Sequence, residues 1–355
     1  MIFYYDYSSH DLENLHALIE HLVKFVWCEA EGDFSYEKLH STLKEIVVKS
    51  DKNTNNGKSK LGKSIELIYN IFLTITQTDR DKIYNAFDIN NMIERLCTDK
   101  DYGPPMKFSD LTTISNDLSI EIKDFFTYLW EGGIKLKAIE EKFGNLNDHY
   151  LNWFEQNDEG ICPFCGIYPL EKCQIEDYDH YLPKGVYPFI SVNFSNLAPI
   201  CQRCNSRYKH SKIPIETSGN TRRLAFYPYA NFHPGLTIIV TLQNRDLYCL
   251  TADEIDLNIE CENHNEQVET WMAVFKIEKR YKEKCLSRNC GRAWYSAIID
   301  EHENVEHILN RQTSKIDLLR MKIREAKQKP NSELNFLKKP FLEACEQNGM
   351  FEEHF

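Results

Sequence analysis

Two C-x-x-C pairs constrain this chain more than any other feature of its sequence. Cys162 and Cys165 form the first pair and Cys201 and Cys204 the second, with 35 residues between the pairs. Each pair can turn two thiolates toward one metal ion, so the duplicated spacing predicts a tetrahedral zinc site with four cysteine ligands. Such a site has no open coordination position, and we therefore expect the zinc to be structural rather than catalytic.

The composition indicates what class of protein contains this zinc site. The chain has 355 residues, 42% hydrophobic and 27% charged, which is typical of a soluble globular protein with a substantial core. No apolar run approaches the roughly 20 residues of a membrane helix, and the N-terminal sequence has no signal-peptide pattern. The other eight cysteines are scattered, which favours buried thiols over disulfides. We expect a cytoplasmic protein without membrane association.

The hydrophobic periodicity predicts a mostly helical α+β fold in three parts. Apolar side chains recur at helical spacing through residues 1–158, which we assign to an N-terminal helical domain. Residues 159–215 form the Cys-rich module, and residues 216–355 form a C-terminal region of strands and helices. Within this last region, 236–242 and 246–252 alternate like the strands of a hairpin, and 256–261 is a candidate third strand.

Polar residues with metal and acid–base chemistry lie between and just after the cysteine pairs. Asp179 and His180 are adjacent, Asn196 precedes the second pair, and Asn205 follows Cys204 directly. Carboxylate and amide oxygens suit Mg²⁺, and imidazole titrates near neutrality and can deprotonate a water. The alternatives without any chemistry are an ordinary turn at Asn196 and a helix cap at Asn205.

The order of these motifs, D-H-x-x-P-K, then N-L, then C-x-x-C-N, resembles the HNH (ββα-metal) endonuclease module in its zinc-stapled form. The resemblance covers residues 162–212 and departs from the literal motif at Asn205, where the last His usually stands. It implies that His180 is the general base and that Asp179 and Asn205 hold one catalytic Mg²⁺ (or Mn²⁺). It also implies that Asn196 fixes the loop bearing the histidine and that the four cysteines are the zinc staple.

More narrowly, the sequence around the motif resembles that of HNH nucleases from bacterial anti-phage systems. Examples are the PtuB nucleases of Septu, which work with an ATPase. This likeness does not extend to residues 1–158. It implies a nuclease component of a defence complex with an ATPase partner.

The charge distribution indicates which segment of the chain could contact nucleic acid. The net charge is −12, yet residues 201–223 carry six basic side chains against the single acidic Glu216. We expect Lys184, Arg207, Lys209 and Lys212 to contact phosphate without reading sequence, although solvated surface positions are an equally simple interpretation. The acidic remainder weakens unspecific DNA binding and favours a protein partner.

The leading hypothesis is a metal-dependent DNA endonuclease, with the flanking helices used for regulation or partner docking. One HNH site cuts one strand, so double-strand cleavage needs an oligomer or repeated nicking. One alternative is a zinc-stabilised nucleic-acid-binding or scaffold protein without catalysis. A stand-alone restriction-type nuclease and an RNA substrate also remain open.

Overall fold

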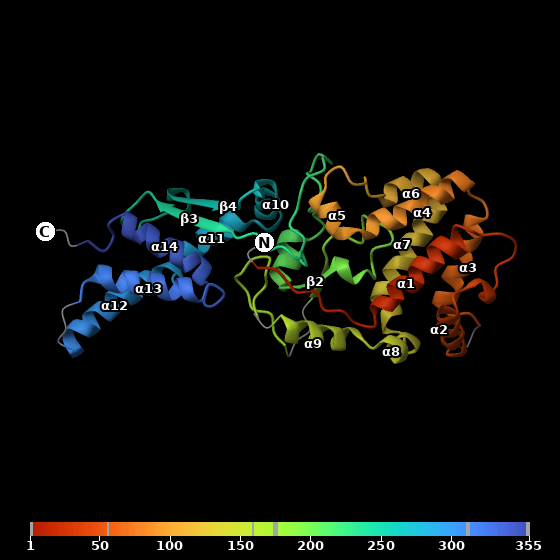
Figure 1. The fold of residues 1–355 in the computed structure, drawn as a ribbon, viewed down its shortest axis with the longest axis horizontal. Helices are drawn as coiled ribbons and strands as arrows, with labels where there is room; N and C mark the ends of the chain where they lie inside the picture. The colour runs from red at the N-terminus through yellow and green to blue at the C-terminus, as the bar shows by residue number, and fades with distance from the viewer. Residues whose placement is uncertain (1–2, 55–56, 158–159, 173–176, 310–312, 353–355) are drawn as a thin grey trace. The chain divides into compact units, whose positions relative to one another are not determined.

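The computed structural model describes residues 3–54, 57–157, 160–172, 177–309 and 313–352. The chain divides into two compact units. The N-terminal unit comprises Tyr4–Gly160 and Leu170–Asn231, and the C-terminal unit comprises Phe232–Phe355 together with Met1–Phe3 and Ile161–Pro169. The predicted fold class is confirmed, because the described residues are mostly helical and their strands form two small antiparallel pairs (Figure 1).

Helices make up most of the N-terminal unit. Side-chain oxygens begin several of them: Ser59 accepts a hydrogen bond from the Gly62 amide, and Ser115 accepts one from the Leu118 amide. The helical elements, in chain order, are α1 (Glu13–His21), the π-helix η1 (Leu22–Trp27), η2 (Tyr36–Lys38), α2 (Ser41–Lys52), α3 (Lys60–Phe72), α4 (Gln77–Asn91), α5 (Ile93–Thr98), α6 (Phe108–Ile114), α7 (Asn116–Glu131), η3 (Gly133–Lys135), α8 (Lys137–Phe143) and α9 (Leu146–Gln156).

The core of this unit joins the helices to the Cys-rich segment. Trp27 is fully buried, packs edge-to-face on Phe125, and donates its indole N–H to the Ile65 carbonyl at 3.1 Å. The same apolar cluster continues into Phe189 and Leu197, which lie far along the chain. The segment between the cysteine pairs therefore shares one core with the N-terminal helices.

Within this segment, two short strands are followed by a helical turn. Strand β1 (Asp177–His180) pairs antiparallel with β2 (Leu197–Ile200), with Asp179 opposite Ala198 and His180 opposite Leu197. The 3₁₀ turn η4 (Phe194–Asn196) leads into β2, and the π-helix η5 (Arg203–Lys209) follows it. The sequence also predicts a strand over residues 174–178; residues 173–176 lie outside the described residues, and the observed strand begins at Asp177.

The C-terminal unit combines a strand pair with helices. Helix α14 packs against both α13 and β3. None of its helices, nor any other helix among the described residues, has the length and apolar character needed to cross a membrane. Its elements are β3 (Thr237–Leu242), η6 (Ala252–Glu254), β4 (Ile255–Glu260), α10 (Asn265–Phe275), α11 (Ile277–Leu286), α12 (Gly291–Leu309), α13 (Lys315–Gln328) and α14 (Asn335–Gln347).

The predicted hairpin between 236–242 and 246–252 is wrong. Strand β3 pairs with β4 instead, from Thr237 opposite Glu260 to Leu242 opposite Ile255. Residues 246–252 form turns, in which the Asp246 carboxylate accepts a hydrogen bond from the Tyr248 amide at 2.9 Å. Side chains that bond their own backbone compete with strand pairing, and the alternation of apolar residues did not reveal this competition.

We predict that acid destabilises the N-terminal unit through His149 on α9. This side chain is 2% exposed, and burial, assisted by His10, lowers its pKa to about 4. The unfolded histidine has a pKa of about 6.5, so the unfolded chain binds a proton that the folded chain does not. The associated stability is present above pH ~6.5 and falls as pH drops toward 4, by on the order of 2 kcal/mol at pH 5.

Denaturant unfolding at pH 7.5 and pH 5 measures this loss of stability. His149→Gln should reduce the loss by about that amount, whereas the exposed His233→Gln should leave it unchanged. An identical loss in His149→Gln and wild type would contradict the assignment.

Candidate functional site

The four paired cysteines come together. One sulfur from each of Cys162, Cys165, Cys201 and Cys204 lies within 4.8 Å of all the others, and all four residues are buried. Four thiolates at this separation match the donor set of a structural zinc ion. These residues could therefore hold zinc, as the sequence predicts.

Backbone hydrogen bonds shape the first cysteine pair as a metal-binding turn. The amides of Cys165 and Gly166 donate to the Cys162 carbonyl, at 3.2 and 2.7 Å. Gly166 has a φ of 64°, a conformation that glycine adopts without strain. The Ile167 amide donates to the Cys165 sulfur at 3.4 Å, and such N–H···S contacts stabilise a thiolate ligand.

Two helices of the C-terminal unit, to which this turn belongs, hold its backbone by hydrogen bonds. Trp271 on α10 donates its indole N–H to the Phe164 carbonyl at 2.7 Å, and the Tyr281 hydroxyl on α11 donates to the Cys165 carbonyl at 3.0 Å. Both side chains are buried. Trp271 thus packs in the core and also holds the backbone of the first cysteine turn.

Asp179 on β1 forms a buried ion pair with Lys209 on η5. The ammonium group lies 2.8 Å from Asp179 Oδ1 and 2.9 Å from the His180 carbonyl oxygen. The two side chains are only 4% and 1% exposed. Burial raises the pKa of Asp179, and the charge of Lys209 opposes that rise. The second carboxylate oxygen, Oδ2, is buried and has no hydrogen-bond partner among the described residues, so it is the oxygen that a further cation could reach.

Lys209 therefore differs from both expectations, which were a contact with phosphate and a solvated position on the surface. It lies neither at a phosphate-binding surface nor in solvent, because its charge neutralises Asp179 inside the protein. No sequence pattern marks the inward side of a single π-helical segment, so this contact could be found only from the structure.

His180, at the end of β1, is held by its ring nitrogen. Nε2 lies 2.9 Å from the carbonyl oxygen of Ser191. Because a carbonyl only accepts, Nε2 carries the proton, and the lone pair lies on Nδ1. Burial, together with the charges of Lys184 and Lys209, lowers the pKa of His180 to about 3. The imidazole is thus neutral at physiological pH, and the same burial and charges make it a weak base in this structure.

Asn196 braces the loop that follows His180. Its side chain is fully buried, with Oδ1 accepting from the Leu182 amide at 2.8 Å and Nδ2 donating to the Leu182 carbonyl at 2.9 Å. The Asn196 carbonyl also accepts from the Tyr181 amide at 2.8 Å. These three bonds fix the chain directly after the histidine.

Asn205 lies on η5, four residues before Lys209. Its backbone amide donates to the Cys201 carbonyl at 3.1 Å, which links the start of this helix to the second cysteine pair. Its side chain is partly buried. The ion pair therefore joins strand β1, which carries Asp179, directly to helix η5, which carries both Asn205 and Lys209.

The other basic residues divide between surface and structure. Arg207 and Lys212 are exposed, and Lys184 lies 3.2 Å from Glu131 on α7. Arg222 and Arg223, which we counted in the basic segment, instead donate to backbone carbonyl groups. Arg222 bonds Leu96 O at 2.8 Å and Ile215 O at 3.2 Å, and Arg223 bonds Pro214 O at 2.9 Å and Ile213 O at 3.2 Å.

Trp130, near the end of α7, lies beside His180. Its ring lies 4.7 Å from the His180 ring, with the ring planes at 82°. The two residues are 50 positions apart in the sequence, and a local motif cannot predict a contact over that separation.

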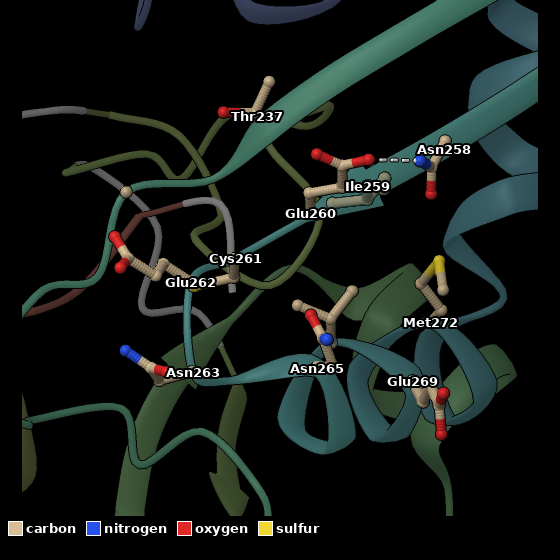
Figure 2. A pocket seen from close by; sticks show the side chains of 12 residues that line it. Thr237, Asn258, Ile259, Glu260, Cys261, Glu262, Asn263, Asn265, Glu269 and Met272 are labelled. Atoms are coloured by element: carbon tan, nitrogen blue, oxygen red, sulfur yellow. Dashed lines mark hydrogen bonds between the residues drawn. The ribbon is translucent and has the colours of Figure 1, made fainter.

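A cavity of about 720 Å³ lies in the C-terminal unit, away from these residues in the sequence. Figure 2 shows Glu260, Glu262 and Glu269 among its lining side chains, with Glu260 accepting a 2.7 Å hydrogen bond from Asn258. None of the predicted site residues lines it. Without a bound cation, its three carboxylates would repel a phosphate group.

Comparison with known proteins gives one local similarity. The chain is 39% identical to the Septu protein PtuB of Bacillus thuringiensis over 57 residues, which is 15% of this chain and 22% of that protein. The match thus spans about a fifth of the PtuB length. No protein-family model matches the chain, and no solved structure matches it.

We predict that the cysteine cluster binds zinc and that its loss destabilises the fold. Because the ligands converge only in the folded chain, metal binding is coupled to folding. Elemental analysis should find a zinc ion in the wild type and none in Cys201→Ser, whose Tm should fall by roughly 5–10 °C. Cys249→Ser, at an exposed cysteine, should keep both zinc and Tm. A zinc-free wild type would contradict the prediction.

A second prediction concerns the Asp179–Lys209 ion pair. Lys209→Met leaves a buried carboxylate without its counter-charge and should cost about 3–5 kcal/mol at pH 7. The pKa of Asp179 would rise further in this variant, so the loss should shrink toward pH ~4, where the carboxyl group is protonated. Denaturant unfolding measures both values. The exposed Lys212→Met should change stability by less than about 0.5 kcal/mol, and an equally small change in Lys209→Met would refute the role of the pair.

Proposed function

We propose that this chain is a metal-dependent endonuclease of the HNH type that hydrolyses phosphodiester bonds in DNA, with residues 159–215 as its nuclease module. The observation that carries the proposal is the orientation of His180. Its Nε2 is committed to the Ser191 carbonyl, so Nδ1 remains to accept a proton, directly beside Asp179 in the chain. The order β1, β2, η5 supports the same reading.

The residues around Asp179 fit a divalent cation. Asp179 Oδ2 is buried and has no hydrogen-bond partner in the part of the chain that the structure describes, and carboxylate and amide oxygens are the ligands that Mg²⁺ prefers. In the proposal, Asp179 and Asn205 hold this ion, either Mg²⁺ or Mn²⁺. When bound, it would polarise the scissile phosphate and stabilise charge on the leaving 3′-oxygen.

The chain's own groups would carry out the proton transfer. His180 Nδ1 accepts a proton from the attacking water as the new P–O bond forms and the bond from phosphorus to the 3′-oxygen breaks. Asn196 keeps the loop after His180 in place. Exposed Arg207 and Lys212 would contact the DNA backbone, without selecting a sequence.

The local similarity to a Septu protein supports a place for this nuclease in bacterial anti-phage defence. We propose that it works in the cytoplasm with an ATPase partner, as the resemblance in its motif implies. One catalytic centre cuts one strand, so a double-strand break would require an oligomer or a second nick.

A zinc-stabilised binding protein without catalysis is the second candidate. The low exposure of Asp179, 3%, and of His180, 8%, favours it, because a catalytic centre must admit water and phosphate. Cleavage by the wild type that depends on His180 would exclude this candidate.

The decisive experiment is a plasmid-cleavage assay with Mg²⁺ or Mn²⁺, with and without a candidate ATPase partner. We expect His180→Ala to lower the rate 10²- to 10⁴-fold, the contribution usual for a general base. His233→Ala, at an exposed histidine of the C-terminal unit, should cut as fast as the wild type. Equal rates in His180→Ala and wild type would eliminate the mechanism.

A further inference from the structure

One face of α7 reaches the candidate base at two points. Phe126 and Trp130 are four residues apart and therefore project from the same side of the helix. The Phe126 ring lies 5.5 Å from the Phe189 ring at 79°, and the Trp130 ring lies 4.7 Å from the His180 ring at 82°. Consecutive turns of one helix thus contact both β1 and the loop that precedes β2.

The first contact holds the carbonyl group that orients His180. Phe189 is fully buried and has a φ of 77°, a backbone conformation that a bulky side chain adopts only when packing enforces it. The rings of Phe87 on α4 and Phe126 on α7 provide that packing, at 5.6 and 5.5 Å. Two residues further on, the Ser191 carbonyl accepts from His180 Nε2.

The second contact acts on the imidazole ring itself. A single hydrogen bond at Nε2 fixes one direction but lets the ring swing about that axis. The nearly perpendicular indole of Trp130 blocks this motion and covers one side of His180, which is 8% exposed. The next residue, Glu131, lies 3.2 Å from Lys184 and so contacts the loop after His180 as well.

We propose that the C-terminal half of α7 is part of the catalytic apparatus and that Trp130 is the positioning residue of His180. This inference rests on the proposed endonuclease function. It gives the N-terminal helices a defined task, which is to hold His180 in place. Small errors in the placement of a catalytic group slow the reaction strongly, since a displacement of about 1 Å can lower the rate 10²-fold.

The test compares Trp130→Ala with Trp130→Phe, which retains an aromatic ring at the contact. The first readout is independent of cleavage: the rate at which diethylpyrocarbonate modifies His180, followed by peptide mass spectrometry. We expect a several-fold faster modification in Trp130→Ala and a rate near wild type in Trp130→Phe. Phe25→Ala, at an aromatic residue that is 55% exposed in the same unit, is the control and should leave the rate unchanged.

The second readout is steady-state cleavage. Trp130→Ala should lower kcat about 10- to 100-fold with little change in KM, and Trp130→Phe should recover most of it. Wild-type reactivity of His180 in Trp130→Ala would overturn the proposal, as would an undiminished kcat. A loss in Trp130→Phe as large as in Trp130→Ala, with both variants folded by circular dichroism, would overturn it too. If the wild type cuts no DNA, the endonuclease function fails, while the modification rate still decides whether Trp130 positions His180.

Discussion

The buried ion pair between Asp179 and Lys209 is the interaction on which the candidate site depends. It joins β1 to η5, and the same ammonium group also bonds the His180 carbonyl. Both ions are removed from water, so neither can lose its partner without leaving an unpaired charge inside the protein. The relative position of the strand that carries Asp179 and His180 and the helix that carries Asn205 is therefore set by electrostatics as well as by packing.

The same pair has a consequence for metal binding in the proposed function. A divalent cation at Asp179 would lie close to the ammonium group of Lys209, and like charges repel strongly where water is scarce. A phosphate group brought by DNA would offset this repulsion with its negative charge. In the proposed function, the metal ion and the substrate would therefore stabilise one another, and the site would have little affinity for the metal ion alone.

The sequence predicted the parts of the site that local spacing encodes, and missed those that depend on distant contacts. The C-x-x-C spacing predicted the convergence of four cysteines, and periodicity predicted a mostly helical fold. The inward orientation of Lys209 and the contact of Trp130 with His180 join residues 30 and 50 positions apart, which no short motif describes. The failed strand at 246–252 has a local cause, because the Asp246 side chain bonds its own backbone there.

The burial of basic residues changes how the charge of the chain bears on DNA binding. Of the six basic side chains in residues 201–223, Lys209 neutralises a carboxylate, while Arg222 and Arg223 bond backbone carbonyl groups. The remaining three, Arg203, Arg207 and Lys212, are exposed on a chain whose net charge is −12. Since each phosphate contact contributes to affinity through counterion release, the three exposed basic side chains of this segment would add little to DNA affinity. The proposed nuclease would then depend on a second component to bring it to DNA, which is a physical reason to expect a partner that does not rely on the motif resemblance.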